Sequence, residues 1–202
     1  MGEALNHRGS VRIACGTADA YGDFVEAREQ FLAADDLFGV ARTLQNLSVL
    51  ELKRGHVRNA RVHIDEALSV RGRMRGPVID LLNYSGLVAL LEGDVTAAHD
   101  AFSELLIGAR RSGTESLVAY ALLGLGFCAH ADGAERLAAI FHGAADARFE
   151  ERGETLDSDL AQLRASDHRR IRRALDERDF ALAYRTGRGL TSSEVVALAL
   201  EA

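Results

Sequence analysis

The sequence predicts an all-α protein assembled from repeated helical hairpins. Of its 202 residues, 48% are apolar and only 6% are aromatic, and it contains 19 glycines and one proline. This composition supplies a core but not the aromatic and β-branched runs typical of sheets. Apolar residues also recur three and four positions apart on both sides of four spaced glycines, which indicates pairs of amphipathic helices.

The repeated unit is visible when the chain is aligned on these glycines. The stretches are AYGDFVEAREQF, KRGHVRNARVHI, LEGDVTAAHDAF and ADGAERLAAIF, around Gly22, Gly55, Gly93 and Gly133, at intervals of 33, 38 and 40 residues. Five residues after each glycine stands an alanine, and nine after it a bulky residue: Ala27, Ala60, Ala98 and Ala138, then Phe31, Ile64, Phe102 and His142. We therefore expect each glycine to mark the turn of a hairpin and each alanine the close crossing of its two helices.

The preceding helix of each unit carries a matching pattern. Eleven residues before the glycines stand Val11, Leu44, Leu82 and Leu122, and seven before them the small residues Cys15, Ser48, Gly86 and Gly126. Pro77 suits the first position of a helix in the third unit, where its missing N–H costs little.

This pattern resembles the tetratricopeptide repeat, a helix-turn-helix unit with a period near 34 residues. The resemblance covers about residues 8–148, although the tryptophan and tyrosine of the strict consensus are missing and two intervals are long. It implies a right-handed superhelical solenoid of degenerate hairpins over residues 1–148, because one hairpin cannot bury its own apolar face. Residues 149–202 would form a helical cap within the same structural unit.

The tail has its own signals. Gly153 breaks the pattern, Ile171 and Phe180 begin two further apolar faces, and residues 187–189 (GRG) suggest an interruption. Thr191 followed by Glu194 is a capping box, which predicts a final helix over residues 192–200 that covers the open end of the solenoid.

The tail also carries a more specific resemblance. RLAAIFHGAADARFEERG and RRALDERDFALAYRTGRGLTSSEVVALALEA resemble the C-terminal end of large LuxR-type and SARP-type bacterial transcription regulators, which are multidomain ATPase regulators. The second element matches at Phe180, Tyr184, Gly187, Leu190, Glu194, Ala197 and Leu200. The chain lacks the phosphate-binding motif GxxxxGK[ST], so the resemblance implies only the regulatory or scaffold end of such a protein.

The tetratricopeptide resemblance implies that the first helix of each unit lines a concave surface that binds a partner. The residues placed there are Arg12, Arg42, Gln45, Asn46, Asn83, Tyr84, Tyr120, Phe127 and His130, with Asp80 beside them. Arginines and asparagines can hold a peptide backbone or a terminal carboxylate. The alternative is that the apolar residues between them, Val49, Leu52, Leu87 and Leu90, simply pack against the next hairpin or a second copy.

The sequence therefore predicts a non-catalytic protein or peptide interaction module, with self-association as another option. The alternative is a small-molecule effector sensor with a pocket between Tyr84, Tyr120 and Phe127. We expect no cofactor, no metal and no catalytic group, because no ligand or nucleophile spacing is present.

The remaining expectations concern charge and location. A net charge of −6 argues against direct nucleic-acid binding, and Arg169, Arg170, Arg172 and Arg173 are expected to form a solvated, partly self-paired face. The longest apolar run, residues 117–129, is too short to cross a bilayer, and no leader is evident, which predicts a cytoplasmic protein without membrane contact.

Overall fold

The computed structural model describes residues 1–15, 20–74 and 79–201, and within these ranges the chain is helical with no strand, as expected. The helix start expected at Pro77 lies outside them. The helices are α1 Gly2–Cys15, α2 Tyr21–Ala33, α3 Leu37–Lys53, α4 Val57–Gly72, α5 Ile79–Glu92, α6 Val95–Ser112, α7 Glu115–Ala131, α8 Glu135–Arg152, α9 Ser158–Ala174, α10 Glu177–Gly189 and α11 Ser192–Glu201.

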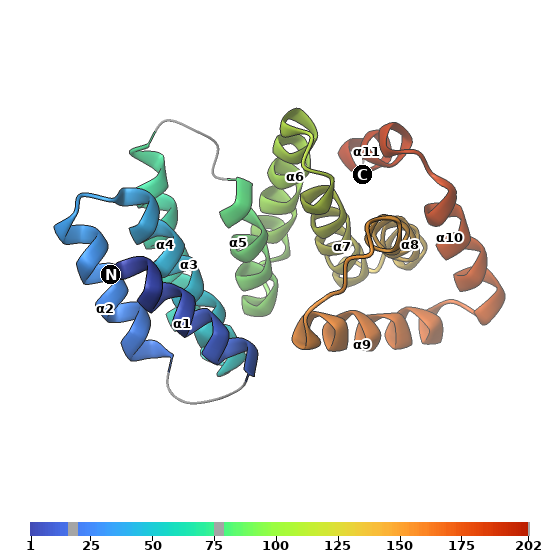
Figure 1. Ribbon diagram of the computed structural model, residues 1–202. Coiled ribbons are helices and arrows are strands. Elements are labelled where there is room, and N and C mark those ends of the chain that lie inside the picture. The colour runs from blue at the N-terminus through green and yellow to red at the C-terminus, as the bar shows by residue number, and fades with distance from the viewer. Residues whose placement is uncertain (16–19, 75–78, 202) are drawn as a thin grey trace. The chain divides into compact units, whose positions relative to one another are not determined.

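The chain divides into two compact units, Met1–Glu92 and Gly93–Ala202, coloured blue to green and green to red in Figure 1. This division differs from the expected boundary after residue 148. It falls at the turn of the third predicted hairpin, so that α5 and α6 belong to different units. The boundary at residue 148 lies inside α8, because the apolar face of that helix continues through Phe149.

Neighbouring helices pair within each unit, most extensively α3 with α4 and α7 with α8. The four alanines predicted at the crossings, Ala27, Ala60, Ala98 and Ala138, are all fully buried. So are Ile64, Phe102 and His142, and Phe31 is nearly so. The repeat therefore specifies which face of each second helix enters the core.

The turn glycines behave as predicted in three of the four repeats. Gly55, Gly93 and Gly133 adopt positive φ, which an L side chain rarely does. Gly113 and Gly153 do the same between hairpins, ending α6 and α8 with left-handed caps.

The assignment of the first repeat is wrong. Gly22 is the second residue of α2 rather than a turn, and Val11 and Cys15 are exposed. The buried face of α1 consists instead of Gly2, Leu5, Asn6 and Gly9, because the rings of Phe31 and Phe24 pack against the two glycines. The crossing of α1 with α2 therefore also requires small residues, but they are Gly2 and Gly9 rather than Cys15.

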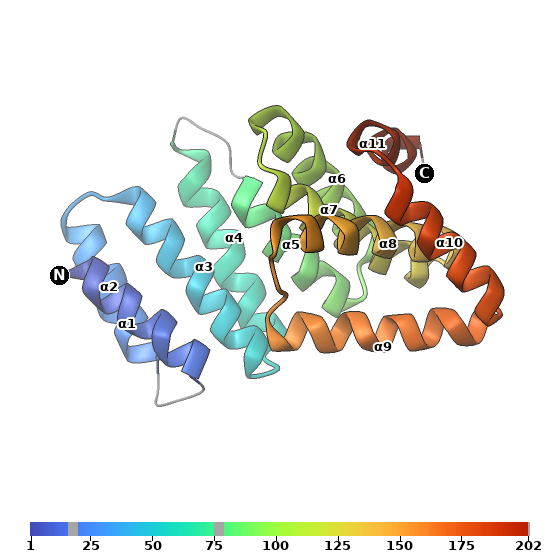
Figure 2. The ribbon, with the colours of Figure 1, turned by 45° about the vertical axis from the view of Figure 1, so that its right-hand side comes forward.

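The second unit ends in three helices that pack against α6 to α8 (Figure 2). The predicted interruption at residues 187–189 is wrong, because α10 continues through Gly189. Gly187 meets the backbone of Ile140, and Gly143 meets the backbone of Tyr184, so the two glycines permit α8 and α10 to cross closely. The final helix is confirmed with its capping box: Thr191 N donates to Glu194 Oε2 at 2.8 Å, and Glu194 N donates to Thr191 Oγ1 at 3.3 Å.

Candidate functional site

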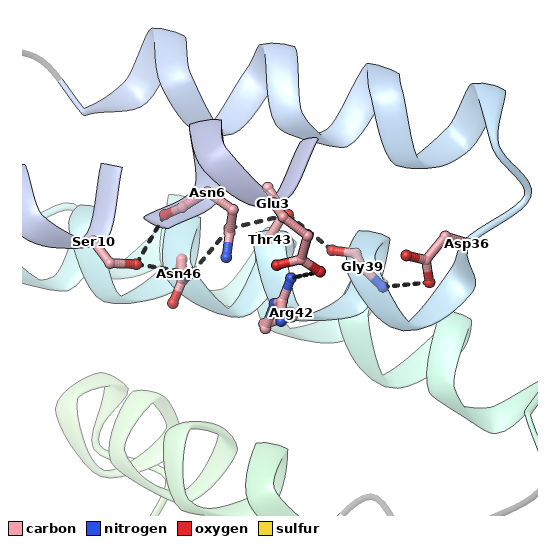
Figure 3. Close-up of polar contacts among 8 residues, drawn as sticks. All are labelled: Glu3, Asn6, Ser10, Asp36, Gly39, Arg42, Thr43 and Asn46. Atoms are coloured by element: carbon pink, nitrogen blue, oxygen red, sulfur yellow. Dashed lines mark hydrogen bonds and ion pairs between the residues drawn. The ribbon is translucent and has the colours of Figure 1, made fainter. Parts of the chain in front are cut away.

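A row of polar contacts joins α1 to α3 in the first unit (Figure 3). We call the six residues Glu3, Asn6, Ser10, Arg42, Thr43 and Asn46 the α1–α3 seam. Asn46 Nδ2 donates to Asn6 Oδ1 at 3.1 Å, and Thr43 Oγ1 donates to the same oxygen at 3.2 Å. Asp36 fixes the start of α3 by accepting from Gly39 N at 2.9 Å. The predicted partner-facing Asn46 is thus already bonded to α1.

A cavity of about 230 Å³ lies beside the seam, formed by α3, α4 and α5. We call it the arginine cavity; its lining residues are Phe38, Ala41, Arg42, Gln45, Arg71, Asp80 and Leu81. Two of the nine predicted site residues, Arg42 and Gln45, meet in it, together with Asp80. The cavity thus combines two guanidinium groups, an amide and a carboxylate with an apolar wall.

The two arginines are arranged around one aromatic ring. The guanidinium carbons of Arg42 and Arg71 lie 5.7 and 5.3 Å from the ring centroid of Phe38, within cation–π range. The Arg42 side chain is 33% exposed and that of Arg71 only 14%. Their charges are therefore partly withdrawn from water, which strengthens their attraction for an anion.

Each arginine also faces one carboxylate of the chain. Arg42 Nη2 lies 2.6 Å from Glu3 Oε1, and Arg71 Nη2 lies 3.7 Å from Asp80 Oδ1. The Arg42 contact is an ion pair rather than an aligned hydrogen bond, and its buried Nε has no acceptor among the described residues. Arg42 therefore retains unused donor capacity among the described residues.

The other predicted residues of the first unit lie apart from the cavity. Arg12 Nη1 contacts Asp23 Oδ2 at 2.6 Å and so ties α1 to α2. Arg8, hydrogen-bonded to Asp23, holds the pKa of that carboxyl below its usual range, with Arg12 adding to the effect. Asn83 is buried, and Tyr84 is half-buried against the core of the unit. Arg12 thus holds α1 to α2, whereas Asn83 and Tyr84 belong to the packed interior of the unit.

The predicted residues of the second unit are used in packing. Tyr120 contacts Phe149 edge-on at 5.1 Å between ring centroids, and Phe127 is buried against His142 at 5.2 Å. His130 Nδ1 lies 2.6 Å from Glu135 Oε2. Of the three residues of the expected aromatic pocket, Phe127 is thus enclosed in the second unit, and Tyr84 belongs to the first unit.

The second unit instead joins the predicted His130 and the repeat residue His142 to two residues that the sequence did not single out, Asp167 and His168. We call His130, His142, Asp167 and His168 the histidine cluster. His142 Nε2 lies 2.7 Å from Asp167 Oδ2, and His130 Nε2 lies 3.5 Å from Asp167 Oδ1. The rings of His142 and His168 are 4.8 Å apart, and burial lowers the pKa of His168 to about 4.

A second set of contacts lies next to this cluster. Asp146 pairs with Arg164 and accepts from Tyr184 Oη at 2.6 Å; burial and this hydrogen bond raise the pKa of Tyr184 to about 12. Together the two sets attach α9 and α10 to α7 and α8. Sequence spacing does not reveal them, because Asp167 and His142 are 25 residues apart in a polar helix and an Ala-rich one.

Some residues of the arginine cavity were also missed. Arg71 lies in the last turn of α4, a second helix of a hairpin, and Phe38 follows the cap of α3, so neither occupies an expected concave position.

Over the described part of the chain, no group of three or more His, Cys, Asp or Glu side chains is positioned to hold a metal ion. Nor do those residues contain a helix with the length and apolarity required to traverse a bilayer.

The arginine run of α9 lies on the surface as predicted. Arg169, Arg170, Arg172 and Arg173 are all exposed. Arg172 lies 3.8 Å from Glu177 and over the ring of Phe180 at 4.5 Å. This partial pairing fits a solvated face.

Comparison with known proteins identifies no relative: no family model matches the chain, and no curated protein or solved structure matches it.

Proposed function

We propose that this chain is a non-catalytic protein or peptide interaction module, in which the arginine cavity receives one anchor residue of the partner. The observation that carries the proposal is that Arg42, Gln45 and Asp80, from two different helices, line a single cavity. Interaction sites gain most of their affinity from a few buried anchors, and arginine is over-represented among the residues that bind them.

The size of the cavity favours a peptide anchor over a metabolite effector. Sites for drug-sized ligands usually measure about 300–1,000 Å³, whereas this cavity measures about 230 Å³. A single side chain or chain end is a better match for such a space. The enclosure of Phe127 removes one wall of the aromatic pocket that the effector alternative requires.

The finer architecture and the cellular role belong to the same proposal. Hairpins with turn glycines and buried crossing alanines support a right-handed solenoid of tetratricopeptide-like units. The resemblance of the tail supports a role as the regulatory or scaffold end of a bacterial transcription regulator in the cytoplasm. Its matched residues Phe180, Tyr184 and Gly187 pack within the second unit, which suits a structural cap.

The test is a screen of synthetic random peptides with free C-termini against the full-length chain, followed by titration of the best binders. We expect Arg42→Gln with Arg71→Gln to weaken their binding at least tenfold, because hydrogen bonds to charged groups contribute about 1.5–3 kcal/mol each. The matched control is Arg58→Gln with Arg73→Gln, which removes two exposed charges, one from α4 and one from the residue that follows its end. Equal losses of peptide affinity in both double variants would show that the cavity does not take part in the interaction. So would peptides that bind without perturbing α3 to α5.

A further inference from the structure

We propose that the arginine cavity is a carboxylate-binding site. In the absence of a ligand, Glu3 of α1 is paired with one of its two arginines, Arg42. This inference rests on the proposed function. It specifies the chemistry of the anchor residue and the side chain, Glu3, that competes with it for Arg42. The ligand is a peptide-like carboxylate that carries a small apolar group. Its binding displaces Glu3 from Arg42.

The first step is the chemistry of the cations. A guanidinium binds a carboxylate best through two parallel N–H groups. Glu3 Oε1 lies 2.6 Å from Arg42 Nη2 without an aligned hydrogen bond, and neither Nη2 nor Nε has a hydrogen-bond acceptor among the described residues. Both nitrogens are buried, so a carboxylate can form the two parallel hydrogen bonds that Glu3 does not form only once the guanidinium turns towards it.

The second step is the weakness of the internal contact. Glu3 is 68% exposed and stands in the first turn of α1, so the carboxylate of this ion pair is largely solvated, although the guanidinium of Arg42 is only 33% exposed. Such exposed pairs contribute at most about 1 kcal/mol. A ligand that matches the carboxylate and adds apolar contact with Phe38, Ala41 and Leu81 can compete with it.

The third step is charge balance, which selects a carboxylate over a phosphate. Among the described residues that line the cavity, the charged ones are Arg42, Arg71 and Asp80, and Glu3 adds a second carboxylate against Arg42. When Glu3 leaves, these described lining residues carry one net positive charge. A single carboxylate restores neutrality, whereas a phosphate dianion would leave an excess negative charge beside Asp80.

The experiment is an NMR titration of the ¹⁵N-labelled full chain with N-acetyl-leucine, which follows backbone amides of α3 to α5 and the Arg42 Nε–H signal. N-acetyl-leucinamide serves as the neutral probe and inorganic phosphate as the alternative anion. We expect the acid to shift these signals and the amide not to, with phosphate binding more weakly than the acid. We expect Arg42→Gln to weaken binding of the acid at least tenfold and the matched Arg58→Gln to leave it unchanged.

The most informative variant is Glu3→Gln, which removes the competing charge from an exposed position. Its predicted effect is a gain of binding, which a misfolded protein would not show. We expect it to tighten N-acetyl-leucine binding by up to about fivefold, the equivalent of an exposed ion pair. Unchanged or weaker binding in this variant would overturn the role of Glu3. Equal binding of acid and amide, tighter binding of phosphate, or no shifts at millimolar acid even in Glu3→Gln would overturn the carboxylate site.

These outcomes are distinct from failure of the proposed function. If library peptides bind through α3 to α5 while the acid and the amide behave alike, the interaction role stands and the carboxylate site falls. If no peptide binds there but N-acetyl-leucine does, the site stands and the interaction role falls.

Discussion

In the first unit, four of the six side chains of the α1–α3 seam remain open to solvent at least in part, and only Asn6 and Thr43 are buried, whereas in the second unit comparable groups are enclosed by α7 to α10. Arg42 and Asn46 retain access to water beside the arginine cavity. His142 is fully buried, and Asp167 nearly so. Partly solvated contacts are exchangeable and therefore suit ligand binding. Enclosed contacts are costly to break and therefore suit the docking of helices.

The largest effect should come from the close crossing in the second unit. Gly187→Ala places a methyl group against the backbone of Ile140, which cannot rotate away. We expect a loss of about 3 kcal/mol or more in the free energy of unfolding, measured by urea denaturation, because backbone overpacking lies at the severe end of such substitutions.

Two glycine variants sharpen this comparison. Gly39→Ala in the first unit meets only the side chain of Phe31, which can shift, so its cost should be smaller. Gly189→Ala meets nothing within 4 Å and should cost nothing. A Gly187 variant as stable as Gly189→Ala would contradict the packing of α10 on α8.

The second prediction concerns the pH dependence of the histidine cluster. In the folded protein the pKa of His168 lies at about 4 instead of 6.5, so the imidazole stays neutral while the unfolded chain binds a proton below pH 6.5. The contribution to stability is complete above pH 6.5 and is lost as the pH falls towards 4. The full shift corresponds to up to about 3 kcal/mol.

The measurement is thermal unfolding of wild type and His168→Phe between pH 7 and pH 4.5. Phenylalanine suits the aromatic neighbours Phe180 and Tyr184 and cannot take up a proton. We expect a shallower loss of Tm in this variant, and the wild-type slope in the exposed control His7→Gln. Equal slopes in all three proteins would show that His168 does not control the acid sensitivity.

The third prediction compares the two polar networks directly. Asp167→Ala removes the carboxylate bonded to His142 and leaves a fully buried ring without that partner, at a cost of about 2 kcal/mol. Asn46→Ala removes the bond to Asn6 at a half-exposed position, at a cost of about 1 kcal/mol. Equilibrium unfolding of both variants tests the difference. A larger loss from Asn46→Ala would reverse our assignment of exchangeable and structural networks.

The sequence predicted the helical class and much of the register because these depend on local periodicity. Buried alanines five residues after the turn glycines, positive φ at Gly55, Gly93 and Gly133, and the Thr191–Glu194 capping box all follow from short-range spacing. The first repeat failed because Gly22 imitates a turn glycine. The phenylalanine rings that decide the packing of α1 come from α2, so the spacing within α1 does not show its buried face.

The candidate site shows what spacing along the sequence does not predict, namely the contacts between side chains of different helices. Repeat position assigned Arg42 and Gln45 to one face of a helix, and both line one cavity, yet Arg71 and Phe38 reach that cavity from positions that the repeat assigns elsewhere. Likewise, no spacing predicts that Glu3 lies against Arg42 or that Asp167 lies against His142. The sequence by itself determined the helical class, three of the four repeat turns and the alanines buried five residues after the glycines, because these obey the geometry of a single chain segment. Only the tertiary structure decided which polar side chains meet, because that depends on how helices distant in sequence approach one another.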